Sequence, residues 1–130
     1  MGGEVSLQNI LKNLNPLLNE GKYVYCKVDD IDTIPLSKIL FLFKEAESIT
    51  IVLKKEEAET LNLEFSYVAS WITLEVHSSL SAVGLTAKFS QALSDAGISC
   101  NVVAAYFHDH IFVDEKDAVK AIEVLNALKE

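Results

Sequence analysis

The sequence predicts an α+β sandwich in which helices cover one face of a β-sheet. Half of the 130 residues are hydrophobic, which is ample for a buried core. The second half of the chain shows the order strand, helix, strand, strand, helix. That order is five-sixths of a βαββαβ unit, so one more strand is needed to complete the sheet.

The second half carries the clearest periodicities. Residues 71–76 alternate polar and apolar side chains, as a half-buried strand does. Residues 85–96 have apolar residues at helical spacing, and Gly97 is expected to end this helix. Residues 98–107 are apolar and β-branched, and a turn around His108 and Asp109 is expected to return the chain as a strand. The final helix has an apolar face formed by Ala118, Ala121, Ile122, Leu125 and Leu128.

The first half is harder to interpret. Ser6 is expected to cap a helix that Pro16 ends or kinks. Residues 23–28 and 49–53 are expected to be strands, residues 54–61 one or two helical turns, and residues 64–76 one long strand or two short ones. Residues 29–35 form a polar connection, and residues 36–46 fit either a helix or a strand.

The missing sixth strand indicates that the two halves share or exchange strands. The first half offers residues 23–28 and 49–53 for this purpose. No linker rich in Gly, Ser or Pro separates the halves. We therefore expect two intertwined units, an N-terminal half at 1–68 and a C-terminal domain at 69–130.

Charge and composition narrow the range of partners. The net charge of −8 opposes binding to nucleic acid or to an anionic membrane. The chain contains no arginine, so an anionic ligand must be held by main-chain N–H groups, hydroxyls or a lysine. Cys26 and Cys100 lie in apolar runs and are expected to be reduced core thiols rather than a redox pair or a nucleophile. No apolar run is long enough to span a membrane, and no leader is evident, so we expect a cytoplasmic protein.

The segment His77 to Ala87 is the best candidate for a binding site. It connects a strand to a helix through small residues and Gly84. The first turn of a helix has free N–H groups, and the helix dipole favours negative charge there. This arrangement predicts a site for a small anion.

Other chemistry is less well supported. His108 and His110 would share one strand face, but zinc would need a third ligand such as His77 or Asp114. Adjacent His77 and Ser78 seldom align as base and nucleophile, and no catalytic or nucleotide-binding motif occurs. We therefore expect no metal, no cofactor and no catalytic residue. The run 29–32 lacks the glycine and distal glutamate of a calcium loop.

Several blocks resemble the ACT domain, a small regulatory module that binds amino acids. The segment from Gly84 to Phe89, followed by Ala96 to Asn101, is most similar to the ACT units of aspartokinases. Further blocks resemble a small stand-alone tandem-ACT family: Pro16-Leu17, Gly21-Lys22-Tyr23-Val24, Phe43-Lys44-Glu45-Ala46-Glu47, Val76 to Thr86, Cys100 to Ala104, and His108-Asp109-His110. Lys44 departs from the arginine expected in that family. The N-terminal half shows the ACT pattern only weakly.

The resemblance implies a ferredoxin-like fold, a ligand at the strand–helix loop and an interface between ACT units. The main chain of the loop, with a polar residue from a neighbouring strand, would hold the amino acid. The matching residues are Ser78, Ser79, Leu80, Val83, Gly84, Leu85 and Asn101. Asn101 offers both a donor and an acceptor to a zwitterion.

The leading interpretation is a non-catalytic regulatory module that binds a small amino acid. It is expected to form a homodimer and to act on a protein partner or through its own association. Two alternatives remain open: a structural or interaction domain without a ligand, and a small metal-dependent enzyme that uses His77, His108 and His110.

Overall fold

The computed structural model describes residues 7–75 and 84–129. These residues form two compact units, each described separately below. Unit 1 contains residues 7–20, 70–75 and 84–129, and unit 2 contains residues 21–69. Strand β5 (Val68–Glu75) takes part in both, because its first two residues belong to unit 2 and the others to unit 1.

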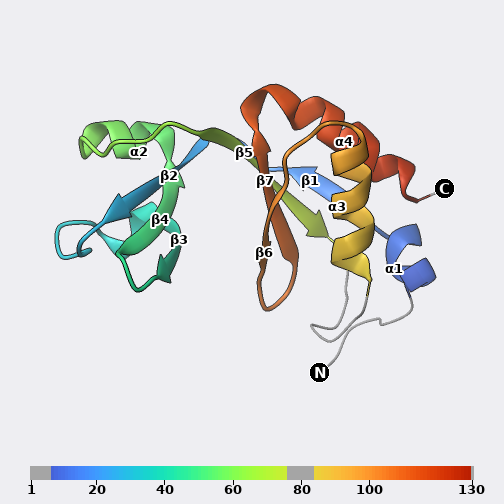
Figure 1. The fold of residues 1–130 in the computed structure, drawn as a ribbon, viewed down its shortest axis with the longest axis horizontal. Helices are drawn as coiled ribbons and strands as arrows, with labels where there is room; N and C mark the ends of the chain where they lie inside the picture. The colour runs from blue at the N-terminus through green and yellow to red at the C-terminus, as the bar shows by residue number, and fades with distance from the viewer. Residues whose placement is uncertain (1–6, 76–83, 130) are drawn as a thin grey trace. The chain divides into compact units, whose positions relative to one another are not determined.

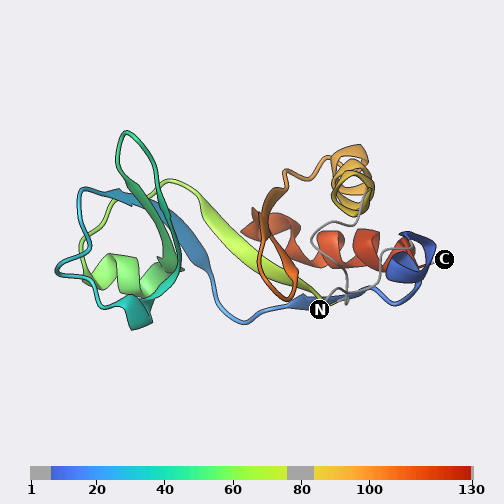
Figure 2. The ribbon, with the colours of Figure 1, turned by 90° about the horizontal axis from the view of Figure 1, so that it is seen from below.

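Unit 1 is a sheet with helices on one face (Figures 1 and 2). Its further elements are α1 (Leu7–Lys12), β1 (Asn15–Leu18), α3 (Leu85–Asp95), β6 (Asn101–Ala104), β7 (Asp109–Asp114) and α4 (Ala118–Ala127). The strand order is β1-β5-β7-β6. The apolar stripes of the helices meet the sheet in one core that includes Leu14, Ile72, Phe89, Ile111 and Leu125.

The strand that completes unit 1 is β1, which is antiparallel to β5 with Pro16 opposite Leu74. The expectation that residues 23–28 or 49–53 would supply it was wrong, as was the extension of the first helix beyond Lys12. Proline cannot donate a main-chain hydrogen bond, which suits a strand paired on only one side. Within the described residues β1 pairs with β5 alone. Pro16 is therefore part of a strand instead of a helix terminator.

Unit 2 contains a second, reduced version of the same chain path. The elements are β2 (Tyr23–Val28), β3 (Ile39–Lys44), β4 (Ile49–Lys54), α2 (Lys55–Thr60) and the start of β5. The strand order is β3-β4-β2-β5. Between β2 and β3, where βαββαβ has its first helix, lies a polar segment with only a 3₁₀ turn at Leu36–Lys38. The ambiguous run 36–46 is therefore mostly strand. The missing helix explains why the ACT pattern is weak in this half.

The other predicted helices and strands are present in the structure, but one turn lies at a different position from the one expected. The hairpin between β6 and β7 turns at Tyr106 and Phe107, because Ala104 pairs with Asp109 and the Ala105 N–H donates to the His108 carbonyl (3.0 Å). The turn expected at His108 and Asp109 was misplaced. The long run 64–76 becomes one strand that starts at Val68. The fold is α+β, with two tandem βαββαβ-type units that share strand β5.

Candidate functional site

Two of the predicted ligand residues, Gly84 and Leu85, form the start of α3. Gly84 is the N-cap residue and has a φ of 95°, a left-handed conformation that glycine adopts without strain. Its carbonyl accepts the Lys88 N–H at 3.0 Å, which closes the first helical turn. A Cβ at this position would lie 3.4 Å from Leu7 Cδ2 of α1. Both the conformation and the neighbour therefore favour glycine.

Leu85 faces the protein interior. Its side chain is buried in the core of unit 1 together with Phe89 and Leu93, which recur on the same face of α3. Only the main chain of Leu85 is then available to a ligand. The other predicted loop residues, Ser78, Ser79, Leu80 and Val83, together with His77, lie outside the described residues.

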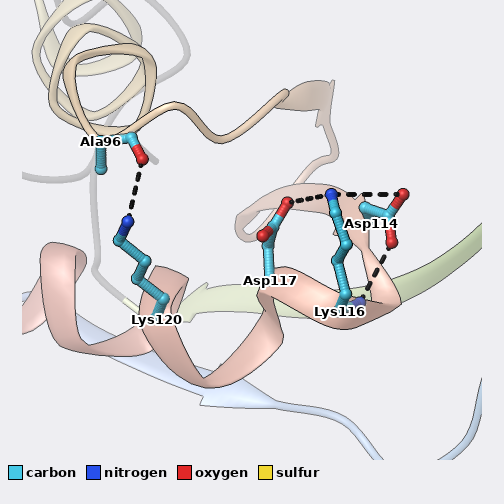
Figure 3. A network of polar contacts seen from close by, with 5 residues as sticks. All are labelled: Ala96, Asp114, Lys116, Asp117 and Lys120. Carbon is cyan, nitrogen blue, oxygen red and sulfur yellow. Dashed lines mark hydrogen bonds and ion pairs between the residues drawn. The ribbon is translucent and has the colours of Figure 1, made fainter.

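The two ends of α3 differ in how their main-chain groups are satisfied. At the C-terminal end Gly97 has a φ of 77°, the Ile98 N–H bonds to Leu93 O at 2.9 Å and the Gly97 N–H to Ser94 O at 2.9 Å, which is a Schellman motif. Lys120 of α4 also donates to the Ala96 carbonyl at 3.2 Å, as Figure 3 shows. Its positive charge complements the negative end of the helix dipole.

At the N-terminal end of α3, Gly84 has no side chain that could accept a hydrogen bond, and the first turn carries no acidic residue. The first turn of a helix presents main-chain donors and a partial positive charge. The start of α3 is thus suited to a carboxylate, whereas its end is satisfied by Gly97 and Lys120.

Beside Lys120, Figure 3 also shows how α4 begins. The Lys116 ammonium lies 3.3 Å from Asp117 Oδ2 and 3.8 Å from Asp114 Oδ2, and the Lys116 main-chain N–H donates to Asp114 Oδ1 at 3.0 Å. Lys116 is largely exposed, so these ion pairs contribute little to stability. Asp114 thus starts the turn that leads into α4, where its carboxylate is engaged by Lys116.

Asn101, the polar strand residue predicted to contact the ligand, is the first residue of β6. It is exposed, pairs with Phe112, and its Nδ2 donates to the Phe112 carbonyl at 3.2 Å. Gly84 precedes α3, whose 11 residues span about 16 Å at 1.5 Å per residue. Gly84 and Asn101 are therefore separated along the chain by the whole of α3. The role of Asn101 in ligand binding stays a prediction.

The histidines of β7 take part in a polar network on the helix-free face of unit 1. Trp71 Nε1 donates to His110 Nδ1 at 3.0 Å, and the Thr73 hydroxyl lies 3.1 Å from the same nitrogen. Asn19 Nδ2 donates to Thr73 Oγ1 at 2.9 Å. Because the indole is only a donor, His110 Nδ1 must be an acceptor, and the proton of the neutral imidazole is on Nε2.

Burial lowers the pKa of His110, and His108 lowers it further, while Asp109 acts in the opposite direction. The His108 and His110 ring centroids are 6.4 Å apart. Residues 7–75 and 84–129 contain no group of three or more His, Cys, Asp or Glu side chains that could hold a metal ion. The network that fixes His110 was not predicted from the sequence, since its members come from three segments that are distant along the chain.

Both cysteines are free thiols in this structure. Cys26 is buried in the core of unit 2, and burial raises its pKa. Burial likewise raises the pKa of Cys100 to about 11. Thiolates are the reactive form, so neither residue is activated for catalysis. Within the described parts of the chain, no helix is long and apolar enough to cross a bilayer.

Comparisons with known proteins agree with this architecture. Residues 2–70 match one family description of the ACT domain, and residues 66–127 match another. The two ranges meet near residue 68, whereas the compact units assign residues 7–20 to unit 1, so the division into 1–68 and 69–130 stays a prediction. No curated protein matches the chain.

Three solved structures illustrate the similarity. A protein of unknown function from Vibrio cholerae, described as a possible transport protein, is 43% identical, with a TM-score of 0.87 over 96% of this chain and 97% of its own. An Agrobacterium tumefaciens protein is 16% identical, with a TM-score of 0.74 over 89% of each chain. The ligand-free regulatory subunit of aspartate kinase from Thermus thermophilus is 11% identical, with a TM-score of 0.62 over 88% of this chain and 97% of its own.

At this identity the aspartate kinase subunit shows a shared fold only. The family matches together extend over nearly the whole chain, and the first alone covers more than half of it. Each match contains most of the strands of one of the two βαββαβ-type units. The chain belongs to the ACT domain family and carries two ACT domains in tandem.

Proposed function

We propose that this protein is a non-catalytic regulatory module that binds a free amino acid at the start of α3. The observation that carries the proposal is the left-handed Gly84 before a first turn that has neither a capping side chain from Gly84 nor an acidic residue. The main-chain donors of that turn would accept the carboxylate of the amino acid. The loop residues Ser78, Ser79, Leu80 and Val83, the main chain of Leu85, and Asn101 would complete the site.

The ACT family supports a regulatory role, since ACT domains are commonly regulatory modules that bind small molecules. The structural similarity to the regulatory subunit of an aspartate kinase points in the same direction. A free-standing regulator must change the behaviour of something else. We infer that ligand binding favours one arrangement of two copies, or of this chain and a protein partner, because a ligand shifts an equilibrium only through its different affinity for the two states.

A second copy would explain how Gly84 and Asn101 serve one ligand. Gly84 precedes α3 and Asn101 follows it along the chain, and we infer that the two residues contact one ligand from different copies. A symmetric dimer would place Asn101 of one copy beside Gly84 of its partner, and would form two equivalent sites. We therefore propose a homodimer. The cytoplasmic location stays a prediction.

The charge of the chain predicts which amino acids bind. The net charge of −8 and the absence of arginine disfavour a second carboxylate on the ligand. Exposed Lys88, in the first turn of α3, would reduce this bias without reversing it. Thermal-shift measurements with the proteinogenic amino acids should identify a ligand, and calorimetry should show tighter binding of glutamine than of glutamate and of asparagine than of aspartate. Tighter binding of the acidic member in both pairs, or no stabilisation by any amino acid, would contradict the proposal.

A further inference from the structure

Unit 2 contains a shallow cavity, largely open to solvent, that the site at α3 leaves unused. Its volume is about 770 Å³, within the usual range for pockets that bind small molecules. Its walls come from β2, from β4 and from the segment 63–66 that leads to β5. The cavity belongs entirely to unit 2 and therefore does not depend on the placement of unit 1.

The cavity exists because β2 has one incompletely paired edge. All of β2 pairs with β4, but only Tyr23 and Val24 pair with β5. The Lys55 N–H donates to the Lys22 carbonyl at 3.0 Å, so the main-chain groups of Lys22 face the β4 side. Main-chain groups alternate along an antiparallel strand, and those of Lys27 therefore point to the opposite, open edge. That edge offers one N–H donor and one carbonyl acceptor.

Two side chains of opposite charge also line this cavity. The Lys27 ammonium comes from β2 and the Glu64 carboxylate from the segment before β5. Both residues are exposed, and neither forms an ion pair or side-chain hydrogen bond with another described residue. An unpaired cation and an unpaired anion beside one strand edge match the two charges of a zwitterion.

The remaining walls are mainly apolar. Leu63 and Phe65 are half-buried, and the ring of Tyr25 contacts those of Phe41 and Tyr67, with centroids 6.2 Å from each. Thr50 donates its hydroxyl to Glu45 at 3.0 Å, so its oxygen can still accept. No further charged side chain lines the cavity. An apolar ligand side chain fits these surroundings better than a charged one.

We propose that this cavity is a second binding site, for a large neutral amino acid. The ligand carboxylate would accept hydrogen bonds from the Lys27 side chain and main-chain N–H. Its ammonium would donate to Glu64 and to the Lys27 carbonyl, with the apolar side chain against Leu63 and Phe65. This site is separate from the one at the start of α3, so each ACT unit has a place for a ligand.

The test is an NMR titration of the isotope-labelled full chain with L-phenylalanine and its two single-charge analogues, phenethylamine and 3-phenylpropionate. L-phenylalanine should shift the amide signals of Lys27, Glu64 and Ser66. Lys27→Met should weaken L-phenylalanine and 3-phenylpropionate about twofold to fivefold, as expected for an exposed charge contact, and should leave phenethylamine unchanged. Glu64→Gln should weaken L-phenylalanine and phenethylamine by a similar factor and leave 3-phenylpropionate unchanged. Lys44→Met and Glu47→Gln, both exposed and outside the cavity, are the matched controls.

The two proposed sites can fail separately. If the shifts lie only at the start of α3 and vanish in Gly84→Ala but persist in Lys27→Met and Glu64→Gln, the cavity is not a site and the proposed function remains. Shifts at the cavity that survive Gly84→Ala, with no amino acid perturbing α3, would support the cavity and overturn the proposed function. No shift at the cavity up to the solubility limit of L-phenylalanine would overturn this inference. Tighter binding of a blocked, uncharged tetrapeptide would also overturn it, and would indicate that the open edge of β2 binds a peptide strand.

Discussion

At the scale of single residues, Gly84 and Gly97 bracket α3 with left-handed conformations. A Cβ at Gly97 would have no heavy atom within 4 Å, whereas a Cβ at Gly84 would approach Leu7. Both positions disfavour side chains because of φ, but only Gly84 lies at the proposed ligand site. Substitutions at the two glycines therefore distinguish the destabilisation caused by backbone strain from a specific loss of ligand binding.

Gly84→Ala and Gly97→Ala should each destabilise the protein by about 1–2 kcal/mol, the cost of a left-handed L-residue. Only Gly84→Ala should abolish the stabilisation by an amino acid, because relief of its strain turns the first N–H groups of α3 away from the ligand. Thermal unfolding with and without ligand measures both effects. Equal loss of ligand response in the two variants would show that strain alone, and not position, is responsible.

His110 links local chemistry to the pH dependence of stability. Trp71 and Thr73 both approach Nδ1, so the folded protein requires a neutral ring with an unprotonated Nδ1. Burial and the nearby His108 lower the folded-state pKa below the usual value of about 6.5. The unfolded chain therefore binds a proton more readily, and the stability contributed by His110 is complete above that value and is lost as the pH falls below it.

The free energy of unfolding should therefore be lower at pH 5.5 than at pH 7.5, and His110→Gln should reduce that difference. Glutamine retains an acceptor for the Trp71 N–H but does not titrate. Urea denaturation at the two pH values gives the comparison. Burial raises the pKa of Asp109 above that of an ordinary carboxyl, so its ionisation lowers the free energy of unfolding as the pH rises, which is opposite in sign to the effect of His110. An unchanged pH dependence in His110→Gln would assign the effect to another group.

At the scale of elements, the N-terminal segment is part of the core of unit 1. Leu14 is fully buried with the helices and strands of the second half, although it lies far from them in sequence. Leu17, in the adjoining strand β1, is 43% exposed. Truncating each of these two leucines therefore tests how much β1 and the residues before it contribute to the stability of unit 1.

Leu14→Ala should destabilise unit 1 by about 2–5 kcal/mol, the range for truncating a buried leucine. Leu17→Ala should cost less than about 1 kcal/mol, because much of its side chain already contacts water. Chemical denaturation followed by the fluorescence of Trp71, the sole tryptophan, monitors this unit directly. Similar values for both variants would mean that the N-terminal segment does not complete the core.

The types of most elements were predictable because they depend on local periodicity. The strand β2 and the helices α2, α3 and α4 follow patterns that a short window contains. The strand β1 was missed because Pro16 is a strong local signal for a helix end, and its pairing with β5 is decided by tertiary contacts. The hairpin turn was misplaced by two residues because the apolar pair Tyr106 and Phe107 looked like strand although it is exposed.

The candidate sites show the same limit. The role of Gly97 in ending α3 was expected, whereas the positive φ of Gly84 is a finding of the structure. The position of Lys27 beside Glu64 at one cavity depends on the path of the chain between distant segments. A single sequence carries little information about tertiary contacts between distant segments. Asn62, which ends α2 in a left-handed conformation with a φ of 56°, was a detectable signal that went unused.

At the scale of the whole molecule, a site shared by two copies predicts that two inactive variants restore binding when they are mixed. A site within a single chain would not show this recovery. If each site takes Gly84 from one copy and Asn101 from its partner, Gly84→Ala and Asn101→Ala homodimers should both lack ligand binding. In a mixed dimer of these variants, one site has both substitutions and the other has neither. Co-refolding equal amounts gives mixed dimers as half of the population, so about a quarter of the wild-type sites should return, one half of the sites in one half of the dimers. Calorimetric stoichiometry measures this recovery, with each variant refolded alone as the control.

Because Asn101→Ala removes one hydrogen bond to Phe112, it should lower stability by only about 0.5–1.5 kcal/mol, and the variant should still fold for the test. No recovery in the mixture, although both variants dimerise, would place the whole site within one chain.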